Sequence, residues 1–207
     1  MTVLVTGGAG YIGSHMVHAL VEAAESVVVI DNLSTGFSAF LPEGVPLFIG
    51  DAADENLVEG VIAAHGVESI IHFAGSVVVP DSMRDPLAYY RNNTMTTRSL
   101  LNAAVKCGLR RFIFSSTAAV YGNPDQVPVP EHAPTRPLSP YGSSKLMSEI
   151  MLHDSVAAHA RSAACRDAGV SRDPQNPSAR CHRAHAARAM PRGTSGRALA
   201  PPSGWSP

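Results

Sequence analysis

The amino-acid sequence predicts an α/β fold, a doubly wound parallel sheet, over residues 1–160. Short, nearly continuous apolar runs alternate with segments of helical periodicity. Glycines stand where the first run passes into the first helix, and glycine, acidic or hydroxyl residues follow the later runs. Apolar strands separated by helices indicate a parallel sheet that is covered on both faces. Right-handed crossovers then predict the strand order 3-2-1-4-5.

The first strand is predicted at Val3–Val5 and is followed by the turn TGGAGYIG, residues 6–13. A helix is predicted after it from the spacing of Ile12, Met16, Val17 and Leu20. Gly7 permits the tight turn, Gly10 lets the backbone approach a pyrophosphate, and Gly13 lets the helix pack on the strand. A phosphate at this turn would meet free helix N–H groups. The context favours a dinucleotide site over an ordinary glycine-rich turn.

The second strand is predicted at residues 26–30, and Asp31 ends it. Asp31 lies 18 residues after Gly13, close to the spacing of a carboxylate that holds both hydroxyls of an adenosine ribose. A carboxylate there repels a 2′-phosphate, and no arginine follows in residues 32–36. These features favour NAD over NADP. The alternative role for Asp31 is a cap at a strand end.

The remaining elements follow in alternation. Strands are predicted at residues 46–50, 69–75 and 111–116, and helices at 54–65, 87–107 and 140–159. Ser139-Pro140 is typical of a helix start. Five residues fall at the predicted carboxyl ends of the strands, where such sheets bind ligands: Gly7, Asp31, Asp51, Gly75 and Thr117. His72 lies within a strand and is interpreted as a core histidine.

Tyr141 and Lys145 are four residues apart and therefore share one face of the last predicted helix. A tyrosine acts as a base near neutral pH only when its phenolate is stabilised, and both an ammonium and a cationic nicotinamide do this. Lys145 can also hold the nicotinamide ribose. Thr117 is expected to hydrogen-bond the substrate hydroxyl that Tyr141 deprotonates. We therefore predict these three as the catalytic residues.

These features resemble the extended short-chain dehydrogenase/reductases, a Rossmann-like family. Several stretches are similar to the UDP-glucose 4-epimerases within it: GGAGYIGSH at 7–15, HFAG at 72–75, YYRNNT at 89–94, FIFSSTAAVYG at 112–122 and SPYGSSKLM at 139–147. The resemblance is continuous over about residues 1–160.

The resemblance implies that NAD stays bound while a UDP-sugar is transiently oxidised at C4, which interconverts UDP-glucose and UDP-galactose. It also implies a set of cofactor contacts. Those expected at the pyrophosphate, ribose and adenine are Tyr11, Ile12, Asp31, Asn32, Asp51 and Ala52; those expected along the rest of the cofactor are Phe73, Ala74, Gly75, Asn92 and Lys145. The family dimerises through helices that correspond to residues 87–107 and 140–159, so a homodimer is expected of an intact member.

Two departures from the family pattern bear on this interpretation. Related sugar-nucleotide dehydratases carry an acidic pair directly after the catalytic threonine, where this chain has Ala118 and Ala119, so dehydration is disfavoured. The family often has a lysine two residues after Gly75, where this chain has Val77. A lysine contact to the cofactor is therefore not expected at this position.

Composition excludes several other classes of protein. The 207 residues contain 3 cysteines, which show neither metal nor disulfide spacing, and no histidine has a partner at metal spacing. No metal site is therefore predicted. No signal peptide and no apolar run of membrane-spanning length are evident, so no membrane association is predicted and the cytoplasm is the expected compartment.

Residues 161–207 differ sharply from the rest of the chain. They carry 8 Lys+Arg against 2 Asp+Glu, whereas residues 1–160 carry 8 against 15. They contain 10 Ala and 6 Pro but no Ile, Phe, Tyr, Lys or Glu. Such a segment cannot bury enough surface to offset its ordering entropy. We expect a low-order tail in place of a sixth strand and substrate domain, and interpret it as a shifted reading frame in GC-rich DNA.

The tail does not favour nucleic-acid binding, because its arginines are scattered and no aromatic residues interleave them. Three functions therefore remain open. The first is a UDP-glucose 4-epimerase whose activity is impaired in this chain. The second is an NAD-binding remnant without turnover, and the third is an epimerase of another UDP-sugar, a glucuronate or an N-acetylhexosamine.

Overall fold

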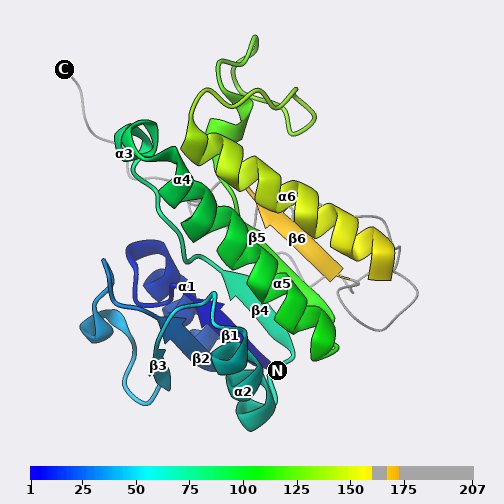
Figure 1. Ribbon diagram of the computed structural model, residues 1–207. Coiled ribbons are helices and arrows are strands. Elements are labelled where there is room, and N and C mark those ends of the chain that lie inside the picture. The colour runs from blue at the N-terminus through cyan, green and yellow to red at the C-terminus, as the bar shows by residue number, and fades with distance from the viewer. Residues whose placement is uncertain (160–166, 173–207) are drawn as a thin grey trace, which may run out of the picture.

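A computed structural model of the chain describes residues 1–159 and 167–172, and contains a parallel sheet with strand order β3-β2-β1-β4-β5-β6 (Figure 1). Its strands are β1 Thr2–Thr6, β2 Ser26–Asp31, β3 Leu47–Ile49, β4 Ser69–His72, β5 Arg111–Ser115 and β6 Asp167–Ser171. The predicted fold class and the predicted order of the first five strands are confirmed. Parallel pairing brings the carboxyl ends of all these strands to one edge of the sheet.

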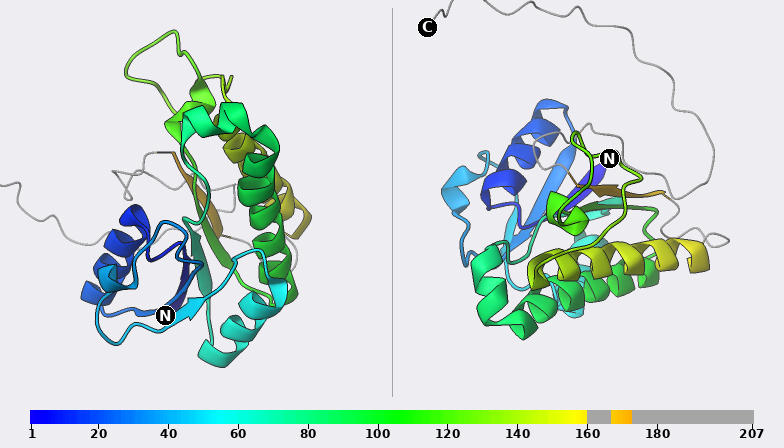
Figure 2. Two further views of the ribbon diagram at one scale, coloured as in Figure 1. Left: turned by 60° about the vertical axis from the view of Figure 1, so that its left-hand side comes forward. Right: turned by 90° about the horizontal axis from the view of Figure 1, so that it is seen from above.

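Helices cover both faces of the sheet. Helix α1 (Tyr11–Glu22) packs on one face, and α2 (Glu55–His65), α5 (Thr96–Lys106) and α6 (Pro140–His159) lie on the other (Figure 2). Short helices α3 (Val79–Arg84) and α4 (Pro86–Tyr89) and the 3₁₀ turns η1 (Ser38–Phe40) and η3 (Ala118–Tyr121) fill the connections. Helix α2 starts at its N-cap Asp54 and ends at Gly66 in the left-handed conformation, as favoured for these residue types.

The core follows from the alternation of side chains along the strands. Leu4 and Val28 face α2, α5 and α6, whereas their neighbours Val3 and Val29 face α1. The larger cluster includes Phe112 and Phe114 of β5, both almost fully buried. The sheet is therefore an apolar layer, and its polar and glycine residues are left at the carboxyl edge.

The structure corrects the expectation that no sixth strand is present. Residues 161–207 were predicted to contain no sixth strand, but β6 pairs with β5 in parallel from Arg111↔Asp167 to Ser115↔Ser171. The strand was missed because Val170 is its single large apolar residue. Its structure depends on backbone hydrogen bonds to β5, which need no apolar side chains. The edge of β5 is therefore covered in this structure.

The predicted helix at 87–107 is also not one regular helix. It consists of α4, a π-helical segment η2 (Tyr90–Met95) and α5. A π-turn carries an extra residue and shifts the helical phase of the side chains that follow. The segment contains two neighbouring asparagines, Asn92 and Asn93, of which the first is exposed and the second buried.

The expectation of a low-order tail at residues 161–207 falls, apart from residues 167–172, on residues outside those that the structure describes. Across residues 1–159 and 167–172, no helix combines the length and the apolar character required to cross a membrane.

Candidate active site and cofactor site

The glycine turn joins β1 to α1 at the carboxyl edge of the sheet. Gly7 has a φ of +72°, and a Cβ on it would lie 2.5 Å from the backbone nitrogen of Ala74. A Cβ on Gly13 would lie 2.1 Å from the carbonyl oxygen of Gly7. Both positions therefore require glycine. Helix α1 starts without a side-chain cap, so its first N–H groups remain available to an anionic ligand.

Asp31 lies at the end of β2, directly beside this turn. Its carboxylate accepts hydrogen bonds from the backbone N–H groups of Ala9 at 2.9 Å and Leu33 at 2.8 Å, and the residue is 8% exposed. The bond to Ala9 ties the glycine turn to the second strand. An ionised carboxylate has about four acceptor positions, so Asp31 retains capacity for a ribose hydroxyl.

The other predicted cofactor residues lie along the same edge. Asn32 is exposed after β2, Asp51 is exposed after β3 and Ala52 is buried beside it. The N–H groups of Phe73 and Ala74 both donate to the carbonyl of Thr6, at 2.9 and 3.1 Å, so the chain after β4 turns across the glycine turn. Tyr11 and Ile12 are exposed at the start of α1.

The π-helical segment separates the roles of two asparagines. Asn92, the predicted cofactor residue, is exposed, and its side-chain amide donates to the Ser76 hydroxyl at 3.2 Å. Asn93, which the sequence reasoning missed, is 2% exposed. It accepts from the Ser76 backbone N–H at 2.8 Å and donates to the Ser144 hydroxyl at 3.0 Å. Asn93 therefore connects the loop after β4 to α6.

Lys145 extends from α6 to the ends of two strands. Its ammonium donates to the carbonyl of Ser115, the last residue of β5, at 3.0 Å. It lies 3.6 Å from where a Cβ on Gly75 would be, and 4.8 Å from the centre of the Phe114 ring. Lys145 is 3% exposed, and this burial lowers its pKa to about 8, because an ammonium loses hydration inside the protein.

Tyr141 lies near Lys145 in the sequence, and Thr117 lies near Ser115, whose carbonyl accepts the Lys145 ammonium. Tyr141 is one turn before Lys145 on α6, is 9% exposed and packs edge-on against Tyr89 at 6.3 Å between ring centres. Thr117 is two residues beyond Ser115, and its hydroxyl oxygen accepts from the Ala119 N–H at 3.1 Å and so caps η3. A Cβ on Gly142 would lie 2.8 Å from the carbonyl of Ala119, so the start of α6 packs directly against the η3 segment that Thr117 opens.

The pKa of Lys145 is directly testable, because the chain contains only two lysines. We expect Lys145 to titrate near pH 8. Lys106 is expected above its ordinary value of 10.5, since Glu55 and Glu59 both accept its hydrogen bonds. Lysine labelled with ¹³C at Cε yields one signal per residue, so one NMR titration compares the two. A Lys145 midpoint at or above that of Lys106 would contradict the prediction.

The same pKa sets a pH dependence of stability. The folded-state pKa of Lys145, about 8, lies below its ordinary value of 10.5, so the unfolded chain binds more protons between these values. Lys145 therefore lowers stability below pH 8, and this penalty is relieved as pH rises from 8 to 10.5. Urea unfolding of the wild type and of Lys145→Met across this range isolates the contribution of Lys145.

His72 belongs to the core rather than to the site, as predicted. Its ring nitrogens lie 2.7 Å from the Thr6 hydroxyl and 3.2 Å from the Thr97 hydroxyl. Burial, together with the charge of Lys145, lowers its pKa to about 3, so His72 is neutral at physiological pH. No group of three or more His, Cys, Asp or Glu residues that could hold a metal ion is found in the described parts of the chain.

Comparisons with known proteins show the family to which the chain belongs. Residues 3–166 match the description "NAD dependent epimerase/dehydratase family". The chain is 54% identical over 157 residues to a UDP-glucose 4-epimerase of Azospirillum brasilense, an alignment that covers 76% of this chain and 45% of the relative. The chain thus spans about half the length of the curated relatives it matches.

Solved structures give the same result. The UDP-glucose 4-epimerase of Bifidobacterium longum, in complex with NAD⁺ and UDP, matches with a TM-score of 0.78 at 36% identity, covering 83% of this chain and 52% of that chain. The Brucella ovis enzyme in complex with NAD matches with a TM-score of 0.77 at 38% identity, again covering 83% of this chain and 52% of that chain. The glycine turn, the parallel sheet and the extent of these matches show that the chain belongs to the NAD dependent epimerase/dehydratase family.

Proposed function

We propose that the chain is the cofactor-binding and catalytic part of a UDP-glucose 4-epimerase, which interconverts UDP-glucose and UDP-galactose. The observation that carries the proposal is the position of Lys145, whose buried ammonium reaches the end of β5 and the vicinity of Gly75 from the same helix as Tyr141. The glycine turn and Asp31 lie along the same sheet edge. The matched relatives are UDP-glucose 4-epimerases, which supports this substrate class.

The described residues fit a bound NAD. A side chain at Gly7 or Gly13 would fill the turn, so the backbone there stays open to a pyrophosphate. We propose that Gly7, Gly10, Gly13, Tyr11 and Ile12 hold the pyrophosphate. The adenosine half is assigned to Asp31, Asn32, Asp51 and Ala52, and the nicotinamide half to Phe73, Ala74, Gly75, Asn92 and Lys145. When bound, NAD accepts a hydride from the sugar C4 and returns it.

In this proposal Tyr141 takes the proton from the sugar 4-hydroxyl and later returns it. Thr117 holds the same hydroxyl by a hydrogen bond. Lys145 carries a positive charge at neutral pH, because its pKa is about 8, and this charge favours the phenolate form of a nearby tyrosine. The 4-keto sugar must turn in the site between the two hydride transfers, which makes the product the C4 epimer.

Replacement of Asp31 tests the cofactor assignment. Asp31→Ala removes the carboxylate that repels a 2′-phosphate, so we expect the ratio of NAD to NADP affinity to fall about tenfold, the scale of one charge-assisted hydrogen bond. Asp31→Asn is the matched control, because it keeps the shape and one acceptor oxygen and loses only the charge. Calorimetric titration of both nucleotides measures the ratio, and an unchanged ratio in both variants removes Asp31 from the site.

Binding of NAD without turnover is a second proposed function, favoured by the length of chain that the relatives have beyond the matched part. Mass analysis of nucleotide released from the purified chain, followed by an assay with UDP-galactose, separates the two functions. NAD together with product formation supports the epimerase, and NAD without product supports the binding module.

We also propose that two copies of the chain associate through α5 and α6. These helices pack against each other, and a surface groove between them is lined by Leu101, Val105 and Met151 together with the polar residues Arg98, Asn102, Asp154, Ser155 and His159. Met147 and Ile150 of α6 are 45% and 53% exposed, an apolar surface of the kind that marks an interface. Sedimentation that shows only monomer at micromolar concentration would contradict this.

A further inference from the structure

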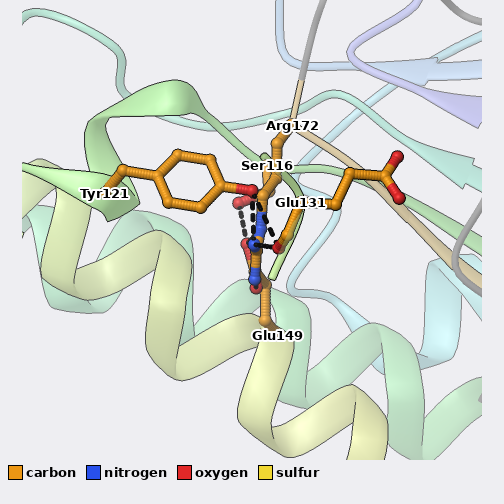
Figure 3. Close-up of polar contacts among 5 residues, drawn as sticks. All are labelled: Ser116, Tyr121, Glu131, Glu149 and Arg172. Atoms are coloured by element: carbon orange, nitrogen blue, oxygen red, sulfur yellow. Dashed lines mark hydrogen bonds and ion pairs between the residues drawn. The ribbon is translucent and has the colours of Figure 1, made fainter. Parts of the chain in front are cut away.

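Arg172, the residue directly after β6, contacts three separate parts of the fold (Figure 3). Its guanidinium donates to the Glu149 carboxylate on α6, with bonds of 2.5, 3.0 and 3.2 Å. It donates to the Tyr121 hydroxyl of η3 at 2.7 Å and to the Glu131 carbonyl at 3.4 Å. It also lies over the Tyr121 ring, 4.9 Å from its centre. Only a planar guanidinium has enough donors for these contacts at once.

Glu149 is a buried carboxylate that needs the charge of Arg172. Its side chain is 9% exposed, and a buried carboxylate is costly unless it is paired and hydrogen-bonded. Arg172 supplies the opposite charge, and the hydrogen bonds to Glu149 are the main reason that the pKa of Arg172 lies above its ordinary value. Glu149 is also one turn after Lys145 and two turns after Tyr141 on α6, so these three residues share one face of the helix.

A second bond connects Glu149 to the end of β5. The Ser116 hydroxyl donates to the Glu149 carboxylate at 2.5 Å. Ser116 stands between Ser115, whose carbonyl accepts the Lys145 ammonium, and Thr117. Three successive residues therefore bind Lys145, bind Glu149 and open η3. Any shift of Ser116 displaces both of its neighbours, because a chain of fixed peptide geometry joins them.

We propose that Arg172 is a positioning residue of the active site, which acts through Glu149 and Ser116 to hold the 115–121 segment and Lys145 in register. This role in an active site rests on the proposed function, but the experiments that test it measure the Lys145 titration and amide exchange, which do not require activity. It assigns a specific task to a residue within the stretch that the sequence suggested to be without structure. A purely structural Arg172 would contribute to stability and leave the environment of Lys145 unchanged.

The test uses the full 207-residue chain with Arg172→Met and Arg172→Lys. Arg172→Met releases Glu149 and with it the 115–121 segment, so the burial that lowers the pKa of Lys145 should be relaxed. The ¹³Cε signal of Lys145 should then titrate higher than in the wild type, toward the ordinary lysine value, while Lys106 is unchanged. Arg172→Lys keeps a charge near Glu149 but cannot make all the other contacts, so it should restore the Lys145 titration only in part. Arg84→Met, which loses an exposed ion pair with Asp81, is the matched control and should leave both lysines unaffected.

Amide hydrogen exchange supplies the second readout. Arg172→Met should raise the exchange rates of the amides of residues 116–122. That increase should be at least about tenfold larger than the increase in β1 and β2, because local opening adds to any global loss of stability. The global unfolding equilibrium should also shift, by on the order of a hundredfold, as one partner of a buried pair is removed. Since Arg172→Met could fail to fold, Glu149→Gln combined with Arg172→Met removes both charges and provides a folded comparison.

The outcomes separate the inference from the proposed function. If the folded variants keep the wild-type titration of Lys145 and the wild-type exchange at 116–122, then Arg172 has no positioning role. Titration with NAD is run in parallel, and a wild-type chain that fails to bind NAD defeats the proposed function while leaving the lysine result to decide on Arg172. If the wild type binds NAD, the affinity of Arg172→Met for NAD should be about tenfold lower. This is the scale of one charge-assisted hydrogen bond, here the one that Lys145 would make to the cofactor.

Discussion

Tyr141→Phe is expected to reduce kcat for UDP-galactose by at least about a hundredfold, since a positioned general base contributes roughly 10²–10⁴. The measurement requires a full-length version of the protein that continues past residue 160 as the relatives do. Phenylalanine keeps the ring that packs against Tyr89 at 6.3 Å and removes only the hydroxyl. NAD affinity should therefore change little, so the loss should appear in kcat rather than in binding.

Tyr90→Phe is the matched control for this experiment. Tyr90 lies on the π-helical segment η2 and belongs to none of the proposed contacts, so its loss of a hydroxyl should leave kcat within about twofold, as expected for a substitution outside the reacting groups. If Tyr141→Phe retains most of the wild-type rate, another group removes the proton and the role assigned to Tyr141 is wrong.

The parts of the fold that sequence predicts best are those with strong local signals. Val3–Val5 and residues 27–30 are continuous β-branched or apolar runs, and both lie in strands of the sheet. The turn at Gly7 was predictable because glycine is needed there twice over, for a positive φ and for the close approach of Ala74. Tyr141 and Lys145 share a helix face by their spacing alone.

The parts that sequence did not predict depend on contacts between distant residues. Strand β6 carries little apolar signal and is defined by its pairing with β5. Asn92 was assigned from the family resemblance, and the buried role of Asn93 depends on its contacts with Ser76 and Ser144, which are distant in the chain. The bond between Arg172 and Glu149 joins residues 23 apart, and neither residue is distinctive on its own.

The described structure changes the reasons for doubting turnover by the isolated chain. A chain without a sixth strand would leave an open apolar edge on β5, but β6 pairs along its whole length. Helix α6 is likewise held in place, because Glu149 and Lys145 both have partners. What remains is the substrate. The chain covers only about half of each matched relative, and none of the described residues outside the catalytic group is assigned to the UDP moiety.

We therefore expect the 207-residue chain by itself to bind NAD but to convert UDP-galactose at least about a thousandfold more slowly than the ~10 s⁻¹ typical of enzymes. Hydride transfer requires the reacting carbon about 3–3.5 Å from its acceptor. Binding energy from remote parts of a substrate is what maintains such a geometry, so a sugar nucleotide whose UDP is not held reaches it rarely. Tyr141, Lys145 and Thr117 would then be in place without a positioned substrate.

The assay follows UDP-galactose conversion by the purified chain with added NAD, beside the full-length version under the same conditions. Tyr141→Phe in the short chain sets the background, because any conversion that survives it does not arise from the proposed base. Conversion by the short chain within about tenfold of ~10 s⁻¹, and abolished by Tyr141→Phe, would overturn this expectation. It would mean that residues of this chain hold the UDP, and the search for them would begin at residues 161–207, the stretch that the composition alone had set aside.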